Sequence, residues 1–182
     1  ILHMKKVVIV SSTPRKGGNS EILAEEFARG AADAGNDVEI IQLRKLKYGF
    51  CSGCLYCQSR GACALKDGID DALLSKVQNA DVLAFATPIY YYSVSGQLKT
   101  FLDRCNPLYP KENRFREVYL LASAADSDQS AIDGAIKDIQ GWIDCFDGVE
   151  FSGVIRGVGA QNVGDIKATS ALRKAYETGR EV

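Results

Sequence analysis

The feature of this sequence that most constrains the fold is a regular alternation of short apolar runs with amphipathic stripes. Runs rich in Val, Ile, Leu, Ala and Phe, bounded by turn residues, are typical of strands buried on both faces of a parallel sheet. They occupy residues 5–11, 38–43, 81–87, 117–122 and 149–158. Alternation of such strands with helices predicts a parallel sheet covered by helices on both faces, with ligands bound beyond the carboxyl ends of the strands.

The helices are expected after each predicted strand. In the first one, Leu23, Phe27, Ala31 and Ala34 recur at helical spacing, and Gly35 follows as the expected C-terminal cap. The same periodicity predicts the others near residues 69–77, 95–105, 132–143 and 165–178, the last of them ending at Gly179.

Composition and charge narrow the class of function. The 182 residues, 46% of them hydrophobic, suffice for one domain with a sizeable core. The net charge of -1 predicts no nucleic-acid partner, and no apolar run reaches the roughly 18 residues of a membrane span. We expect a cytoplasmic protein that acts on small molecules. Residues 1–3 resemble a cloning remnant, so the domain is expected to span residues 4–182, without any histidine for catalysis or metal binding.

The loop at residues 11–20 joins the first predicted strand to the first predicted helix. Backbone N–H groups and the helix dipole favour an anion at this position. The loop lacks the glycine patterns that bind dinucleotides or triphosphates, so a terminal monophosphate suits it better. An ordinary turn with a helix cap is the alternative interpretation. The candidate phosphate-binding residues are Ser12, Thr13, Arg15, Gly18, Asn19 and Ser20.

An aromatic loop follows the third predicted strand. Three consecutive tyrosines are not expected to be all buried, and aromatic rings can stack on a planar ligand. In a sheet of order 2-1-3-4-5 this loop lies beside the phosphate loop, at the topological switch point. A tyrosine-rich turn or a subunit contact is the alternative. The candidate ligand-binding residues are Pro88, Ile89, Tyr90, Tyr91, Tyr92 and Ser93.

The two loops carry motifs that resemble the NADPH-dependent FMN reductase and flavodoxin superfamily. Residues 13–20 (TPRKGGNS) are similar to its FMN phosphate loop, and residues 88–90 (PIY), 95–99 (SGQLK) and 103–104 (DR) are similar to its later motifs. The resemblance implies a flavodoxin-like three-layer α/β sandwich with a five-stranded parallel sheet of order 2-1-3-4-5. It also implies a homodimer or homotetramer.

The same resemblance implies FMN as the cofactor and NAD(P)H as the electron donor. The tyrosine loop would contact the ribityl chain and the isoalloxazine ring. A third FMN loop is expected after the fourth predicted strand, on fold position alone. Its candidate residues are Ser123, Ala124 and Asp126.

The connection at residues 44–68 is overlong and contains Cys51, Cys54, Cys57 and Cys63. A metal cluster bound by the four thiolates would hold such a segment in place. The spacing of these cysteines differs from that of ferredoxins and from that of typical zinc sites. Disulfides are uncommon in cytoplasmic proteins. The compact C-x2-C-x2-C-x5-C pattern resembles the iron-sulfur flavoprotein family, which implies one [4Fe-4S] cluster on these thiolates. Unligated thiols and regulatory disulfides stay open.

Two further cysteines, Cys105 and Cys145, lie on apolar helix faces and are expected to be buried packing residues. The function expected for the whole chain is an NAD(P)H-dependent FMN oxidoreductase whose electrons pass to a quinone, a nitro or azo compound, or ferredoxin. No side chain is assigned as a catalytic acid or base. The alternatives are a flavodoxin-like electron carrier without enzyme activity and a cysteine-based redox sensor.

Overall fold

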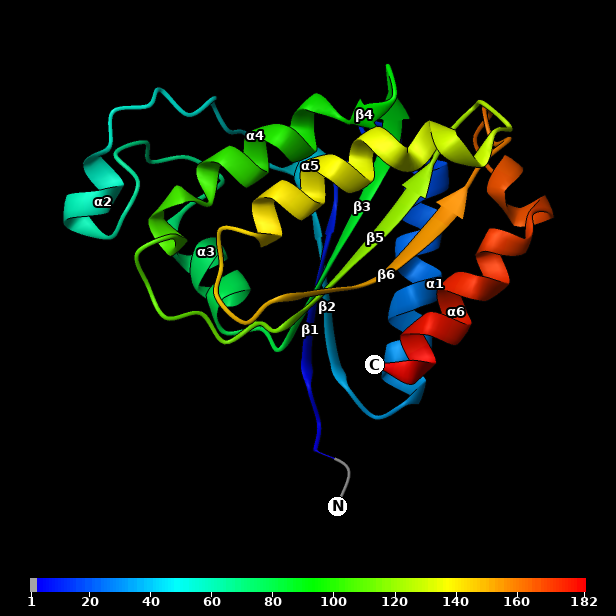
Figure 1. Ribbon diagram of the computed structural model, residues 1–182, viewed down its shortest axis with the longest axis horizontal. Helices are drawn as coiled ribbons and strands as arrows, with labels where there is room; N and C mark the ends of the chain where they lie inside the picture. Colours follow the sequence, from blue (N-terminus) through cyan, green and yellow to red (C-terminus); the bar gives the residue numbers. More distant parts are fainter. Residues whose placement is uncertain (1–2) are drawn as a thin grey trace.

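The computed structural model describes residues 3–182 and places a parallel sheet between two layers of helices (Figure 1). The order of the main strands is β2-β1-β3-β5-β6, and every neighbouring pair is parallel. These strands are β1 (Lys6–Ser11), β2 (Asp37–Gln42), β3 (Val82–Tyr90), β5 (Glu117–Ser123) and β6 (Glu150–Gly157). With the short β4 (Ser93–Val94) set aside, this is the predicted order 2-1-3-4-5, and the predicted flavodoxin-like fold class is confirmed. Residues 1 and 2 of the expected cloning remnant lie outside the described residues.

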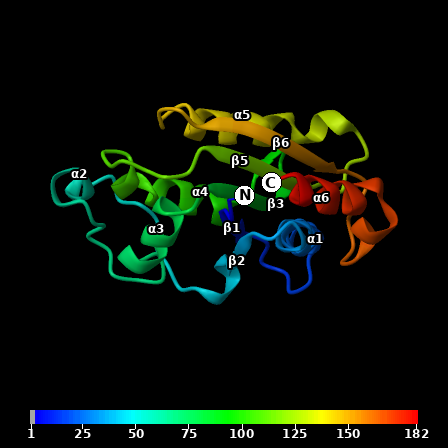
Figure 2. The ribbon, with the colours of Figure 1, turned by 90° about the horizontal axis from the view of Figure 1, so that it is seen from below.

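The helices cover both faces of the sheet. One face carries α1 (Asn19–Asp33) and α6 (Ser170–Glu181), and the other carries α3 (Asp71–Gln78), α4 (Gly96–Arg104) and α5 (Asp133–Ile143) (Figure 2). The five-residue α2 (Tyr56–Arg60) lies apart from both layers, beyond α3 and α4. Short 3-10 turns complete the chain at η1 (Leu43–Lys45), η2 (Asn106–Leu108), η3 (Gln129–Ile132) and η4 (Asp165–Ala168).

Alternate side chains of β3 divide the core into two parts. Leu83 and Phe85 pack with α3, α4 and α5, whereas Ala84 and Ala86 pack with α1 and α6. All four side chains are fully buried, which explains why the run was apolar without alternation in the sequence. No helix within residues 3–182 is both long enough and apolar enough to cross a membrane.

The two helices on the α1 face meet backbone to backbone at two glycines. A Cβ added at Gly30 would lie 2.1 Å from the Tyr176 carbonyl oxygen, and one added at Gly179 would lie 2.2 Å from that of Phe27. The prediction that α6 ends at Gly179 is therefore wrong, because the helix continues to Glu181. This glycine permits close helix packing instead of ending the helix.

The chain also contains a hairpin that the sequence pattern did not reveal. β3 continues past the predicted end at residue 87, and β4 turns back along it, pairing Tyr90 with Ser93 and Ile89 with Val94. The two turn residues, Tyr91 and Tyr92, have φ angles of 49° and 61°. Such left-handed positions usually carry Gly or Asn, so the tyrosines hid the turn signal.

Candidate functional site

The phosphate loop lies at the carboxyl end of β1 and is bonded to its neighbours by buried hydroxyls. Ser12 Oγ donates to the Ala86 carbonyl at 3.0 Å, and Ser95 Oγ donates to Ser12 Oγ at 2.9 Å. Ser95 also caps α4, where its side chain accepts from the Leu98 N–H. The hydroxyl chain joins the loop to β3 and to the start of α4, so three segments of the predicted site share one edge of the sheet.

Ser20 is the most informative residue of this loop. It lies in the first turn of α1 with 1% of its surface exposed, and its Oγ has no hydrogen-bond partner among residues 3–182. The N-cap residue, Gly18, is also buried, and a Cβ there would lie 2.6 Å from Thr13 Oγ1. Buried hydroxyls are nearly always paired, so the orphaned Ser20 hydroxyl fits the binding of an acceptor such as a phosphate oxygen.

The side chain of Asn19 is committed to the protein itself. Its Nδ2 donates to the carbonyls of Ala160 and Asn162, and its Oδ1 accepts from the N–H groups of Gly164 and Ile166. These four bonds hold the loop after β6 against α1. Asn19 therefore has a structural task here, and a direct contact with a ligand stays a prediction. The predicted cation Arg15 donates to the Gln161 carbonyl and is partly exposed.

Glu21 supports the loop and was not expected from the sequence. Its buried carboxylate accepts from Arg44 Nη2 at 3.1 Å, from Gln42 Nε2 at 2.7 Å and from the backbone N–H of Gly17 at 3.2 Å. An acidic residue in the first turn of a helix is common, so no signal in the sequence marked its role. The partners come from the end of β2 and the turn after it, which only the sheet brings near.

The tyrosine turn and the loop after β5 face each other. Pro88 pairs with Ser123 in the parallel register of β3 and β5, and Tyr92 donates from its hydroxyl to Asp126 Oδ2 at 3.1 Å. This hydrogen bond raises the pKa of Tyr92. A cavity of about 220 Å³ lies between the two segments. Its lining residues are Ile89, Tyr91, Tyr92, Ala124, Ala125, Asp126 and Ala131.

Helix α5 holds the tyrosine turn from behind. Gly134 lies so close that a Cβ on it would stand 2.0 Å from the Tyr92 carbonyl oxygen. Asp138 Oδ2 accepts from Ser93 Oγ and from the Val94 N–H. The prediction that the three tyrosines are not all buried is confirmed: all three are exposed, and Tyr91 is wholly so. The left-handed backbone of the tyrosine turn is thus kept in place by contacts with α5, a helix some forty residues later in the chain.

The four clustered cysteines line one cavity in the segment between β2 and α3. Cys51 and Cys54 are exposed, Cys63 is half-buried and Cys57 is buried. The cavity measures about 30 Å³, which is room for little more than a water molecule. Within residues 3–182 no three Cys, His, Asp or Glu side chains form a group ready to hold a metal ion. The donor set is that of an iron-sulfur site, but the exposed sulfurs would have to move to close it.

A buried ion pair anchors this segment to α4. Arg104 is 1% exposed, and its Nη1 and Nη2 donate to the two carboxylate oxygens of Asp67 at 2.8 and 2.9 Å. It also donates to the carbonyls of Gly49 and Ile69. The hydrogen bonds from Arg104 lower the pKa of Asp67 to about 2. Arg104 belongs to the Asp-Arg pair that the sequence singled out, but its partner was not foreseen.

The other two cysteines behave differently from each other. Cys105 is buried, as predicted, and burial raises the pKa of its thiol. Cys145 is exposed, so the prediction that it packs in the core is wrong. The helix α5 ends at Ile143, and the chain turns there, which leaves the Cys145 thiol at the surface with its Sγ near the Gly141 carbonyl.

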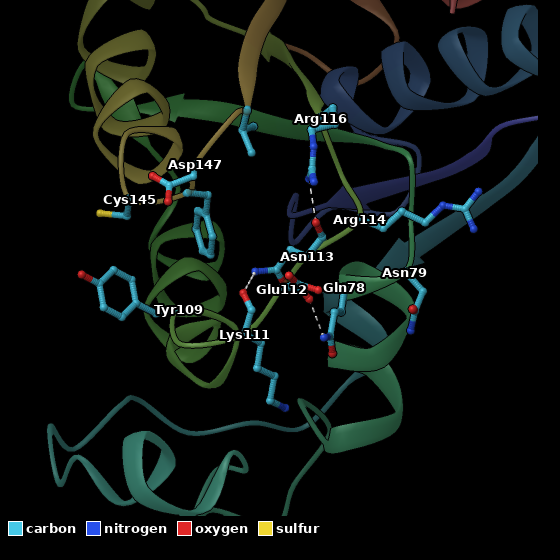
Figure 3. Close-up of a pocket in the computed structure, with 12 residues that line it drawn as sticks. Gln78, Asn79, Tyr109, Lys111, Glu112, Asn113, Arg114, Arg116, Cys145 and Asp147 are labelled. Atoms are coloured by element: carbon cyan, nitrogen blue, oxygen red, sulfur yellow. Dashed lines mark hydrogen bonds between the residues drawn. The ribbon is translucent and has the colours of Figure 1, made fainter.

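A cavity of about 610 Å³ lies at the opposite edge of the sheet, where β3, β5 and β6 begin (Figure 3). Two of its three cationic groups already have partners. Arg116 donates to the carbonyls of Asn113 and Phe115, and Arg114 donates to Asp81. Because ligands of such sheets bind beyond the carboxyl ends of the strands, the candidate site is the edge formed by the three loops.

Comparison with known proteins agrees with this geometry. The family model of the NADPH-dependent FMN reductases matches residues 5–162, which is most of the chain. This chain belongs to that family. The same edge of the sheet that carries the orphaned Ser20 hydroxyl and the tyrosine turn lies within the matched residues.

Individual relatives and solved structures extend the comparison. An iron-sulfur flavoprotein of Methanocaldococcus jannaschii is 36% identical over 57% of this chain and 53% of its own length, and one of Archaeoglobus fulgidus is 36% identical over 57% and 46%. The chain thus spans about half the length of these two relatives. A solved NAD(P)H:quinone oxidoreductase from Methanothermobacter marburgensis superimposes with a TM-score of 0.74 at 19% identity, covering 98% of this chain and 97% of that one.

Proposed function

We propose that this chain is an NAD(P)H-dependent oxidoreductase that holds FMN at the carboxyl edge of its sheet. The observation that carries the proposal is the buried Ser20 hydroxyl, which lacks a partner within residues 3–182 and lies at the start of α1. The N–H groups of that first helical turn and this hydroxyl suit the terminal phosphate of FMN. When bound, FMN supplies hydride chemistry with the nicotinamide and electron transfer to an acceptor.

Each of the three loops would contact a different part of the cofactor. The loop containing Ser12, Thr13 and Arg15 would bind the phosphate, and the tyrosine turn would contact the ribityl chain and the ring. The cavity of about 220 Å³ beside Tyr92 and Asp126 supports a ring site there. Stacking on an aromatic side chain contributes about 0.5 to 1.5 kcal/mol per contact.

The acceptor is proposed as a small oxidised molecule, such as a quinone or an azo or nitro compound, or ferredoxin. The names of structural neighbours, a quinone oxidoreductase and an azoreductase of Bacillus anthracis, support the first two classes. No residue of the site is proposed as an acid or base. We also propose a cytoplasmic homodimer or homotetramer built from one domain, residues 4–182, with residues 44–68 as a cysteine-containing insert.

We further propose that Cys51, Cys54, Cys57 and Cys63 ligate one [4Fe-4S] cluster. Four thiols on one cavity, together with the names of the iron-sulfur flavoprotein relatives, support this assignment. Anaerobically purified protein is expected to contain iron, and Cys57→Ser should lose it while keeping flavin. Cys145→Ser is the matched control and should keep both, because Cys145 lies outside the insert. Protein made with ample iron that contains flavin but no iron would refute the cluster.

The test of the flavin site uses the Ser20 hydroxyl. Ser20→Ala should weaken FMN binding by roughly ten- to a hundredfold, since one hydrogen bond to a charged acceptor contributes about 1.5 to 3 kcal/mol and each 1.4 kcal/mol is a factor of ten. It should not destabilise the flavin-free protein, because the hydroxyl is unpaired there. Ser152→Ala, on the exposed side of β6, is the control. Extracted flavin identified by chromatography should be FMN, and recovery of FAD alone or an unchanged Ser20→Ala affinity would reject the loop assignment.

A further inference from the structure

Asn106 directs its side-chain amide at one of the four clustered sulfurs. Its Nδ2 donates to Cys57 Sγ at 3.0 Å, and Cys57 is the buried member of the set. Asn106 lies in η2, directly after α4, whereas Cys57 lies in α2 of the insert. The contact therefore joins the packed body of the protein to the segment that carries the thiols.

Arg104 lines the same cavity and has one N–H donor without a partner among the described residues. The Asp67 carboxylate and two carbonyls account for its Nη1 and Nη2, yet its Nε is buried and has no hydrogen-bond partner among the described residues. Arg104 and Cys63 both line the cysteine cavity. Buried N–H groups are nearly always paired, so an unpaired one at this cavity indicates an acceptor there.

We propose that Arg104 and Asn106 are positioning residues that set the reduction potential of the cysteine-bound cluster, Asn106 by donating to Cys57 and Arg104 by donating from Nε to Cys63. The inference rests on the cluster proposed above. Neither Arg104 nor Asn106 is a proposed ligand of the cluster, and both belong to elements outside the insert.

The expected effect is a rise in the reduction potential. Reduction adds one electron, hence one negative charge, to a cluster, and an N–H group that points at a ligand sulfur stabilises that charge. Asp67 neutralises the Arg104 guanidinium, so Arg104 acts mainly through the local N–H dipole. Asn106 is neutral and acts in the same way.

The placement of the donors suits this role. Arg104 ends α4 and is fully buried, so its position is set by the core and by Asp67. The cysteines, in contrast, lie on a segment with exposed Phe50, Leu55 and Tyr56. When the exposed Cys51 and Cys54 move to close the site, the donors on α4 and η2 would hold Cys57 and Cys63 in place.

The test is a potentiometric titration of the reconstituted cluster, followed by electron paramagnetic resonance, with iron per chain measured in parallel. Asn106→Ala should shift the midpoint potential to a more negative value with unchanged iron content. Asn106→Asp, which replaces the donor with a carboxylate, should shift it further in the same direction. Asn79→Ala is the matched control, because Asn79 is exposed at the other edge of the sheet, and it should leave the potential unchanged.

Arg104→Lys keeps the charge opposite Asp67 and removes the Nε–H, so it should also lower the potential. Should that variant fail to fold, the Asn106 variants alone decide, since Asn106 is partly exposed in a turn. Iron-loaded Asn106 variants with the parental potential would overturn this inference and leave the cluster standing. An Asn106 variant that loses its iron would also overturn it, in favour of a purely structural role. A parent protein without iron would overturn the cluster and this inference together.

Discussion

The contact between Gly134 and the tyrosine turn allows a sharp test of how the flavin site is held. A Cβ at Gly134 would stand 2.0 Å from the Tyr92 carbonyl oxygen, and real Cβ contacts essentially never fall below 3.0 Å. In Gly134→Ala the turn must therefore retreat by about 1 Å. That movement would strain the left-handed Tyr91 and Tyr92 and stretch the bonds to Asp138.

The same helix contains a matched control. A Cβ at Gly141 would meet no atom within 4 Å among the described residues outside its chain neighbours and the backbone of its own helix, and the position is exposed. Replacing an exposed helical glycine by alanine stabilises a protein by about 0.5 to 1 kcal/mol. Gly141→Ala should show that gain. Gly134→Ala should fall below Gly141→Ala by the overpacking cost, about 1 to 3 kcal/mol.

Both variants would be measured by urea unfolding of the flavin-free protein and by FMN fluorescence titration. Gly141→Ala should bind FMN like the parent. Gly134→Ala should bind it roughly three- to tenfold more weakly, which corresponds to the loss of one aromatic stacking contact of about 0.5 to 1.5 kcal/mol. Equal stability and equal FMN affinity in the two variants would refute the idea that α5 sets the position of the turn.

Three further predictions follow from the packing. Because Arg104 lowers the pKa of Asp67 to about 2, the contribution of this carboxylate to stability is complete above its unfolded-state pKa of about 4 and is lost as the pH falls through about 2. Asp67→Asn should flatten the acid limb of the stability curve over that window, and an unchanged acid limb would contradict the ion pair. Under native conditions a thiol reagent should modify Cys145 and should modify buried Cys105 only after denaturant is added. Mass spectrometry of the labelled peptides checks this, and labelling of Cys105 before Cys145 would contradict it. Gly179→Ala should lose about 1 to 3 kcal/mol in urea unfolding because its Cβ meets the backbone of α1, and a gain in stability would argue against that close contact.

Much of the fold could be predicted because its three central strands, β1, β3 and β5, are buried on both faces. The apolar runs at residues 5–11 and 117–122 correspond to β1 and β5 with ends shifted by a single residue. The prediction of turns and helix ends failed where a residue adopts a conformation that is unusual for its type. Tyr91 and Tyr92 occupy left-handed turn positions, and Gly179 lies inside a helix, so turn and cap signals pointed the wrong way at these places.

The location of the candidate site was also predictable, because the carboxyl ends of neighbouring parallel strands share one edge. The structure places the Ser20 loop, the tyrosine turn and the Asp126 loop at that edge. The contacts that hold those loops were not predictable. Glu21 finds Arg44 across 23 residues of sequence, and no periodicity marks such a pair.

The sequence by itself determined the order of strands and helices, the places of the three loops and the grouping of four cysteines in one connection. These features follow from local composition and from the geometry of parallel sheets. Only the tertiary structure decided that Asn19 bonds to the loop after β6, that Cys145 is exposed, and that Asn106 and Arg104 reach the cysteine cavity. The contacts of Asn19, Asn106 and Arg104 depend on distances between segments far apart in the chain, which packing sets and local sequence does not encode. The exposure of Cys145 depends on where α5 ends and the chain turns away from the core.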